Sequence, residues 1–191
     1  MAAPQRNLRG FTLIELMVTL VIMAILVAFA LPNFRDLLRR NQVASASNAL
    51  LASLSYARTE AITRGQLVSI CPSSDGEACT AGGTAFDPGW LVYSYPAGAA
   101  SANLAYNATG ATLLRANGAQ RSVSIKSLGS TVITFGQQGQ LKPNTPLAFV
   151  TCFRSASSGD GAATDAVSGT QLDVNGSGSV TSKSTAVCTP P

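Results

Sequence analysis

The sequence contains no histidine among its 191 residues. A chain without histidine has no Ser-His-Asp triad, no Cys-His pair, no imidazole acid or base and no histidine ligand for a metal. Carboxylates and lysines remain, so catalysis is not excluded outright, but the commonest catalytic chemistries are. We therefore expect a protein that is not an enzyme and that has no catalytic residues, cofactor or metal site.

Charged residues are also scarce, at 12% of the chain, which is about half of the usual fraction. The net charge of +4 arises near the N-terminus, because residues 66–191 hold six basic and six acidic side chains. A neutral domain gives no electrostatic footprint for a phosphate backbone, so we do not expect DNA as a partner. Apolar runs recur to the end of the chain, which argues against a disordered protein.

Residues 11–31 form one apolar stretch in which only Thr12, Glu15 and Thr19 are polar. A helix of this length rises about 30 Å, which is enough to cross the hydrocarbon core of a bilayer. Arginines flank the stretch on both sides, so the flanking charge alone leaves its orientation open.

Three interpretations of this stretch compete. It could be a cleaved secretory signal with Ala28-Phe29-Ala30 as its cleavage site, an uncleaved signal anchor, or a segment retained after removal of a short polar leader. Glu15 argues against the first two, because a carboxylate near the centre of an apolar span costs about 2.5–3.5 kcal/mol. Such a group needs a partner, either a cation of another chain or a free amino terminus.

The junction Arg9-Gly10-Phe11-Thr12-Leu13-Ile14-Glu15 resembles the leader junction of type IV prepilins and type II secretion pseudopilins. The shared features are a basic leader, a glycine, a phenylalanine, and a glutamate as the fifth residue of the mature chain. The resemblance implies that prepilin peptidase cleaves between Gly10 and Phe11 on the cytoplasmic side and that the new amino group of Phe11 is methylated. It also implies that Glu15 pairs with the terminal amine of a neighbouring subunit during assembly.

On this interpretation residues 1–10 are the leader peptide and residues 11–31 are a single transmembrane helix in the bacterial inner membrane. The C-terminal domain is then periplasmic until the subunit enters a pilus or pseudopilus. Residues 11–40 would pack inside that filament.

We expect the helix to continue over residues 32–65, with a kink or a local break at Pro32. A narrow stripe of small and apolar side chains predicts that one face of this part packs on the C-terminal domain; it consists of Leu50, Leu54, Ala57 and Ala61. Arg64 followed by Gly65 predicts the end of the helix.

After Gly65 the pattern changes to short apolar segments bounded by Gly, Pro, Asn and Ser. They cover residues 67–71, 89–95, 122–126, 131–135, 147–153, 170–174 and 179–182. A helix followed by a run of strands indicates an α+β fold, with an antiparallel sheet in a globular domain over residues 66–191. We expect its core to contain Trp90, Phe135, Phe149 and Phe153, and residues 96–112 and 155–169 to form exposed loops.

Four cysteines follow the apolar stretch and allow three pairings: Cys71, Cys79, Cys152 and Cys188. A periplasmic domain is expected to form disulfides. The first two are the local choice, because a Pro-Ser-Ser-Asp-Gly turn separates them, and the other pair would then tie the tail to a central strand. The alternative is a zinc site, which the long spacing of the first pair and the lack of histidine disfavour.

The C-terminal part resembles the GspH/FimT group, which includes minor pilins of the FimT and FimU kind and the minor pseudopilin GspH. Three segments carry this resemblance: LVSICPSSDGEAC at 67–79, GWLVY at 89–93 and ITFGQQGQL at 133–141. The resemblance implies a minor subunit near a filament tip, whose partners are other minor and major pilins.

Three functions fit these observations. The chain could be a minor pilin that primes a type IV pilus or joins a tip complex to it, a minor pseudopilin of type II secretion, or a DNA-binding minor pilin for natural transformation. DNA-binding proteins of the FimT kind carry a Gly-Arg-x-Arg motif near the C-terminus, and residues 175–180 read Asn-Gly-Ser-Gly-Ser-Val instead. We therefore expect a pilus subunit that does not bind DNA.

Overall fold

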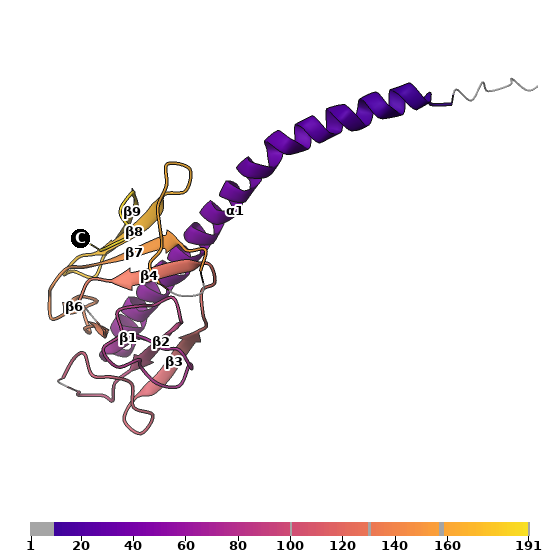
Figure 1. The fold of residues 1–191 in the computed structure, drawn as a ribbon. Coiled ribbons are helices and arrows are strands. Elements are labelled where there is room, and N and C mark those ends of the chain that lie inside the picture. Colours follow the sequence, from indigo (N-terminus) through magenta and orange to yellow (C-terminus); the bar gives the residue numbers. More distant parts are fainter. Residues whose placement is uncertain (1–9, 100, 130, 157–158, 191) are drawn as a thin grey trace, which may run out of the picture. The chain divides into compact units, whose positions relative to one another are not determined.

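The computed structural model describes residues 10–99, 101–129, 131–156 and 159–190. It contains one long helix, α1, at Leu13–Arg64, which precedes all the strands in the described part of the chain (Figure 1). The strands are β1 Val68–Pro72, β2 Trp90–Ser94, β3 Thr112–Asn117, β4 Val123–Ser127, β5 Ile133–Phe135, β6 Leu141–Lys142, β7 Leu147–Phe153, β8 Gly169–Val174 and β9 Val180–Thr185.

The strands form two antiparallel sheets. Their orders are β3-β2-β1-β5-β6 and β4-β7-β8-β9, and every pair of neighbours is antiparallel. This confirms the predicted α+β fold with a long N-terminal helix. All seven predicted strands are present, with boundaries that differ by up to three residues.

Strands β3 and β6 were not predicted. In β3 the side chains are exposed or half-buried, so its sequence lacks the alternation that marks a strand. Strand β6 has only two residues, and its pairing with β5 follows from the turn at residues 136–140. Neither strand carries a hydrophobic pattern of its own.

The chain divides inside α1 into two compact units, Met1–Leu38 and Arg39–Pro191. The second unit therefore begins at Arg39, before the change of sequence pattern at residue 65. The reason is the stripe on α1: Leu50, Leu54, Ala57 and Ala61 are fully buried and belong to the main hydrophobic core.

The core of the second unit lies between α1 and the two sheets. Trp90, Phe135 and Phe149 are fully buried in it, as expected. The prediction for Phe153 was wrong in degree, because this residue ends β7 and is only half-buried. Its ring lies 4.9 Å from the guanidinium carbon of Arg39.

The end of α1 shows how its sequence stops the helix. Gly65 has a φ of +60°, which glycine adopts without strain. The N–H of Gln66 donates to the carbonyl of Ala61 at 3.3 Å, and that of Gly65 donates to Ile62 at 3.4 Å. This is the Schellman arrangement, and it ends the helix where Arg64-Gly65 predicted. The predicted local break at Pro32 is absent, since the helix is continuous through that position.

The prediction of an exposed loop over residues 96–112 was only partly right. A second cluster of buried side chains lies on the face of the first sheet opposite the main core, and Tyr106 and Ala111 pack against it. Described residues of this loop thus cover the sheet, and its last residue belongs to β3.

Candidate processing and assembly site, and the disulfide-linked domain

The predicted cleavage position lies just outside the helix. Gly10 and Phe11 precede the first residue of α1, and Phe11 is 82% exposed. Among the described residues, no heavy atom lies within 4 Å of the position that a Cβ of Gly10 would occupy. None of these residues therefore obstructs the bond between Gly10 and Phe11. The rest of the leader, residues 1–9, lies outside the described residues.

Thr12 caps the N-terminus of α1. Its Oγ1 accepts a hydrogen bond from the N–H of Glu15 at 3.2 Å, and its carbonyl accepts the N–H of Leu16 at 3.2 Å. A threonine three residues before a glutamate is a helix-start pattern that the sequence itself shows. The cap places Glu15 in the first turn, where the helix dipole favours a negative charge.

The surface that follows Glu15 is apolar. Leu16, Leu20, Met23 and Leu26 are all more than half exposed, like most large side chains up to Leu37. Among the described residues, α1 is the one helix long and apolar enough to cross a membrane. A signal sequence meets the same test of length and composition. Glu15 is the one charged side chain between Phe11 and Phe34 in the sequence.

All four cysteines form disulfides. Cys71 is joined to Cys79 with Cα atoms 5.6 Å apart, and Cys152 is joined to Cys188 with Cα atoms 5.8 Å apart. These are the pairs that the spacing favoured. The described residues include no cluster of three or more potential metal ligands.

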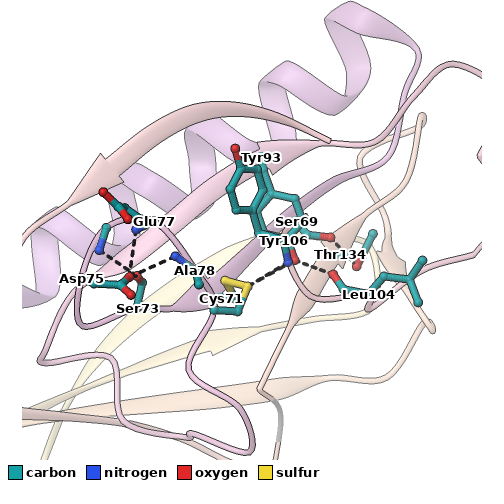
Figure 2. Close-up of a disulfide and its surroundings, with 12 residues drawn as sticks. Ser69, Cys71, Ser73, Asp75, Glu77, Ala78, Tyr93, Leu104, Tyr106 and Thr134 are labelled. Atoms are coloured by element: carbon teal, nitrogen blue, oxygen red, sulfur yellow. Dashed lines mark hydrogen bonds between the residues drawn. A yellow bond between two sulfur atoms is a disulfide. The ribbon is translucent and has the colours of Figure 1, made fainter. Parts of the chain in front are cut away.

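The first disulfide sits within an aromatic cluster, part of which Figure 2 shows. The Sγ atom of Cys79 accepts the N–H of Tyr106 at 3.1 Å, and the Tyr93 hydroxyl donates to the carbonyl of Leu104 at 2.6 Å. Burial raises the pKa of the Tyr93 phenol. The disulfide and the loop before β3 therefore pack against each other on the sheet, and each stabilises the position of the other.

The turn between the two cysteines is organised by Asp75. Its Oδ1 accepts the N–H groups of Glu77 at 2.9 Å and of Ala78 at 3.0 Å, and the hydroxyl of Ser73 at 3.1 Å (Figure 2). These bonds, from Glu77 first and then from Ala78, lower the pKa of the Asp75 carboxyl. The three residues that donate these hydrogen bonds lie within three positions of Asp75 in the sequence. Local contacts therefore stabilise the turn.

The turn between β8 and β9 contains residues 175–179, which belong to the stretch that the sequence analysis compared with the DNA-binding motif. A Cβ on Gly178 would lie 1.9 Å from the carbonyl oxygen of Gly139, so the two hairpin turns touch backbone to backbone. Arg58 of α1 donates to the carbonyls of Gly139 at 3.0 Å and of Ser177 at 3.2 Å. This turn serves as a contact between the two sheets.

Two family models match this chain. The model described as type II transport protein GspH matches residues 46–178, and the model of the prokaryotic N-terminal methylation motif matches residues 5–31. The chain therefore belongs to the GspH family, and its N-terminus carries the methylation motif of pilin-like proteins. This family matches the resemblance seen in the sequence.

Two crystal structures of the type IV minor pilin FimU of Pseudomonas aeruginosa strain PAO1 have a similar fold. One has a TM-score of 0.55 at 23% identity, and covers 78% of this chain and 97% of its own. The other has a TM-score of 0.51 at 22% identity, and covers 76% of this chain and 98% of its own. At this identity the similarity establishes a pilin-like fold.

Proposed function

We propose that this chain is a minor pilin of a type IV pilus, which primes assembly or joins a tip complex to the filament. The observation that carries the proposal is the combination of a methylation motif at residues 5–31 with a GspH-family domain whose fold matches that of FimU. In this role the protein is a structural subunit and not a catalyst.

The N-terminal segment provides processing and anchoring. Prepilin peptidase cleaves between Gly10 and Phe11, and the Phe11 amine is then methylated. The exposed apolar helix holds the subunit in the inner membrane before assembly, with the C-terminal domain in the periplasm. The two disulfides support this side of the membrane, because such bonds persist in oxidising compartments.

Glu15 provides the specificity of assembly. Its carboxylate lies in the first turn of an otherwise uncharged apolar surface, where an unpaired charge is costly in lipid. The terminal amine of a neighbouring subunit neutralises it when the two chains are shifted along the filament axis. A wrong axial shift leaves two unpaired charges, so the pair sets the register between subunits.

The second candidate is a minor pseudopilin of type II secretion, which the description of the matched family model favours. The two functions predict different locations and phenotypes. We expect the protein in pili sheared from wild-type cells, and deletion of the gene to reduce surface pili while secretion of type II substrates continues. Loss of secretion with normal pili would support the pseudopilin instead.

DNA binding is the function that we do not propose. The turn at residues 175–179 contains no arginine and packs against the β5–β6 turn, and Lys183 beyond it pairs with Asp173 at 2.8 Å. A salt-dependent shift of DNA mobility by the purified protein would contradict this.

Processing can be tested separately from assembly. We expect Gly10→Val to leave a full-length membrane protein that retains its leader, because the added side chain obstructs the peptidase. Gly110→Val is the matched control, since that glycine is also surrounded by open space but is far from the junction in the sequence. Mass spectrometry that finds a mature Phe11 terminus in Gly10→Val would refute the cleavage position.

A further inference from the structure

The bond between Gly10 and Phe11 lies just before α1. These two residues and Thr12 are outside the helix, which begins at Leu13. Among the described residues, no backbone N–H donates to the carbonyl of Gly10. Hydrolysis of a peptide bond places negative charge on its carbonyl oxygen, so this oxygen must be free for donors of the enzyme. The structure therefore presents the Gly10 carbonyl in a state that a peptidase can use.

The state of this carbonyl depends on where α1 begins. In an α-helix the carbonyl of the N-cap residue accepts the N–H of the residue four positions later. If Gly10 were the N-cap, its carbonyl would accept the N–H of Ile14 and would no longer be free. Glycine is about as good an N-cap as threonine. The sequence therefore contains two competing helix starts, one after Gly10 and one after Thr12.

The first turn of α1 favours the later start. Thr12 Oγ1 accepts the N–H of Glu15 at 3.2 Å, and the Thr12 carbonyl accepts the N–H of Leu16 at 3.2 Å. A start at Leu13 also makes Glu15 the third helical residue, where the helix dipole favours its charge. A start at Phe11 would move Glu15 beyond the first turn. Thr12 and Glu15 thus both favour a helix that excludes the scissile bond.

We propose that Thr12 is a positioning residue for processing, because its hydroxyl caps α1 and so keeps the Gly10 carbonyl outside the helix. This inference rests on the proposed function, which supplies the peptidase. The cap raises the fraction of the precursor in which the scissile carbonyl is free. Apparent affinity falls in proportion when only a fraction of the molecules is competent to bind, whereas the step after binding is unaffected. The cap should therefore act on KM and not on kcat.

Thr19 provides a matched control. It is the other threonine of the apolar stretch, and its hydroxyl donates to the carbonyl of Leu16 at 2.9 Å inside the helix. Replacement of either threonine by valine removes one hydroxyl, keeps the shape of the side chain and makes the stretch more apolar by the same amount. Only the replacement at Thr12 removes the cap. A difference between the two variants therefore reports the helix start and not insertion into the membrane.

The test is cleavage of the full-length precursor by purified prepilin peptidase in phospholipid vesicles. Loss of a cap shifts the balance between two helix starts about fivefold, so we expect Thr12→Val to raise KM by about two- to fivefold. The kcat of Thr12→Val should be unchanged, and Thr19→Val should match wild type in both constants. Equal KM values for the two variants, or an effect of Thr12→Val on kcat alone, would overturn the proposal.

Other capping residues separate the cap from direct recognition of threonine by the peptidase. Serine and asparagine cap helices at least as well as threonine, and asparagine does so without a hydroxyl. We expect Thr12→Ser and Thr12→Asn to be cleaved with the KM of wild type. If Thr12→Asn behaves like Thr12→Val, the peptidase recognises the hydroxyl itself and the proposal is wrong.

Hydrogen exchange measures the helix start without the peptidase. The N–H of Ile14 has no hydrogen-bond partner in the described part of the chain, whereas a helix that starts after Gly10 would bond it to the Gly10 carbonyl. NMR of the full precursor in detergent micelles should therefore show slower exchange of this N–H in Thr12→Val than in Thr12→Ser. Equal exchange in the two variants refutes a shift of the helix start.

Failure of the proposed function gives a different result. If prepilin peptidase does not cleave the wild-type precursor, processing itself is refuted, and this inference with it. If the wild type is cleaved and Thr12→Val has the same KM, this inference alone is refuted.

Discussion

The guanidinium of Arg154 and the carboxylate of Asp87 lie 2.9 Å apart, and their side chains are only 11% and 8% exposed. Asp87 also accepts the N–H of Ile125 at 3.3 Å, and Arg154 donates to the carbonyl of Gly159 at 3.0 Å. The pair therefore connects the segment before β2, strand β4 and the loop after β7.

We expect Arg154→Met to lower the free energy of unfolding by about 3–5 kcal/mol, because it leaves the Asp87 carboxylate buried without its countercharge. The control is Lys183→Met, which breaks the exposed pair with Asp173 and should cost no more than about 1 kcal/mol. Urea unfolding of the full chains measures both. Similar costs for the two variants would show that burial of the Arg154–Asp87 pair is energetically unimportant.

Glu15 is predicted to act in assembly and not in processing. We expect Glu15→Ala to be cleaved normally and to stay in the inner membrane, since the variant helix enters lipid more easily without the carboxylate. It should enter filaments poorly, because the charge that selects the axial register is gone. The ratio of the variant in sheared pili to that in the membrane, relative to wild type, measures this. An unchanged ratio would mean that contacts of the C-terminal domain suffice for incorporation.

The two disulfides should differ in their contribution to stability. The loop closed by Cys152–Cys188 spans 36 residues, and that closed by Cys71–Cys79 spans 8. Chain entropy predicts losses of about 3.8 and about 2.5 kcal/mol when each pair is replaced by serines. Denaturant unfolding of the two double variants tests the order. A larger loss for the short loop would indicate that its aromatic contacts outweigh loop length.

The Asp75 turn predicts a pH dependence. Because hydrogen bonds lower the pKa of Asp75 in the folded state, its contribution to stability is fully present above the unfolded pKa of about 3.9. It is lost as the pH falls through the folded pKa. The stability difference between wild type and Asp75→Ala should therefore be constant above about pH 5 and shrink below about pH 4. A difference that grows on acidification contradicts this assignment.

Gly178 and Gly98 provide a matched pair of glycines, since both have a φ of +80°. A Cβ on Gly98 meets no atom of the described residues within 4 Å, whereas a Cβ on Gly178 meets the Gly139 carbonyl. We expect Gly98→Ala to cost about 1 kcal/mol from backbone strain alone and Gly178→Ala to cost at least about 2 kcal/mol more, because the two turns must separate. Thermal melting distinguishes the variants, and equal losses would exclude a role for the backbone contact.

Sequence patterns predicted the parts of this fold that depend on strong local periodicity. The stripe on α1 has the spacing of a helix, and Gly65 is a local stop signal. The seven strands are short apolar segments bounded by turn residues. The α+β class followed from their order. The junction at Gly10 and Phe11 revealed the family resemblance. A short motif of this kind is recognised from its residues in order, so it can be found without knowledge of the tertiary structure.

The remaining features depend on contacts between distant segments. The Asp87–Arg154 pair joins residues 67 positions apart, and neither side chain lies in a motif. Strand β3 is defined by β2 beside it and not by its own apolar pattern. Thr12 is the exception, since its position three residues before Glu15 was a local signal that could have been used.

The burial of the α1 stripe has a practical consequence for biochemical work on this protein. A fragment that starts at residue 66 would carry every strand but would lack Leu50, Leu54, Ala57 and Ala61, which fill the centre of the core. It would expose the inner faces of both sheets and should aggregate. A soluble fragment suited to crystallisation or partner screening must therefore start near Arg39, inside the helix and after the apolar segment.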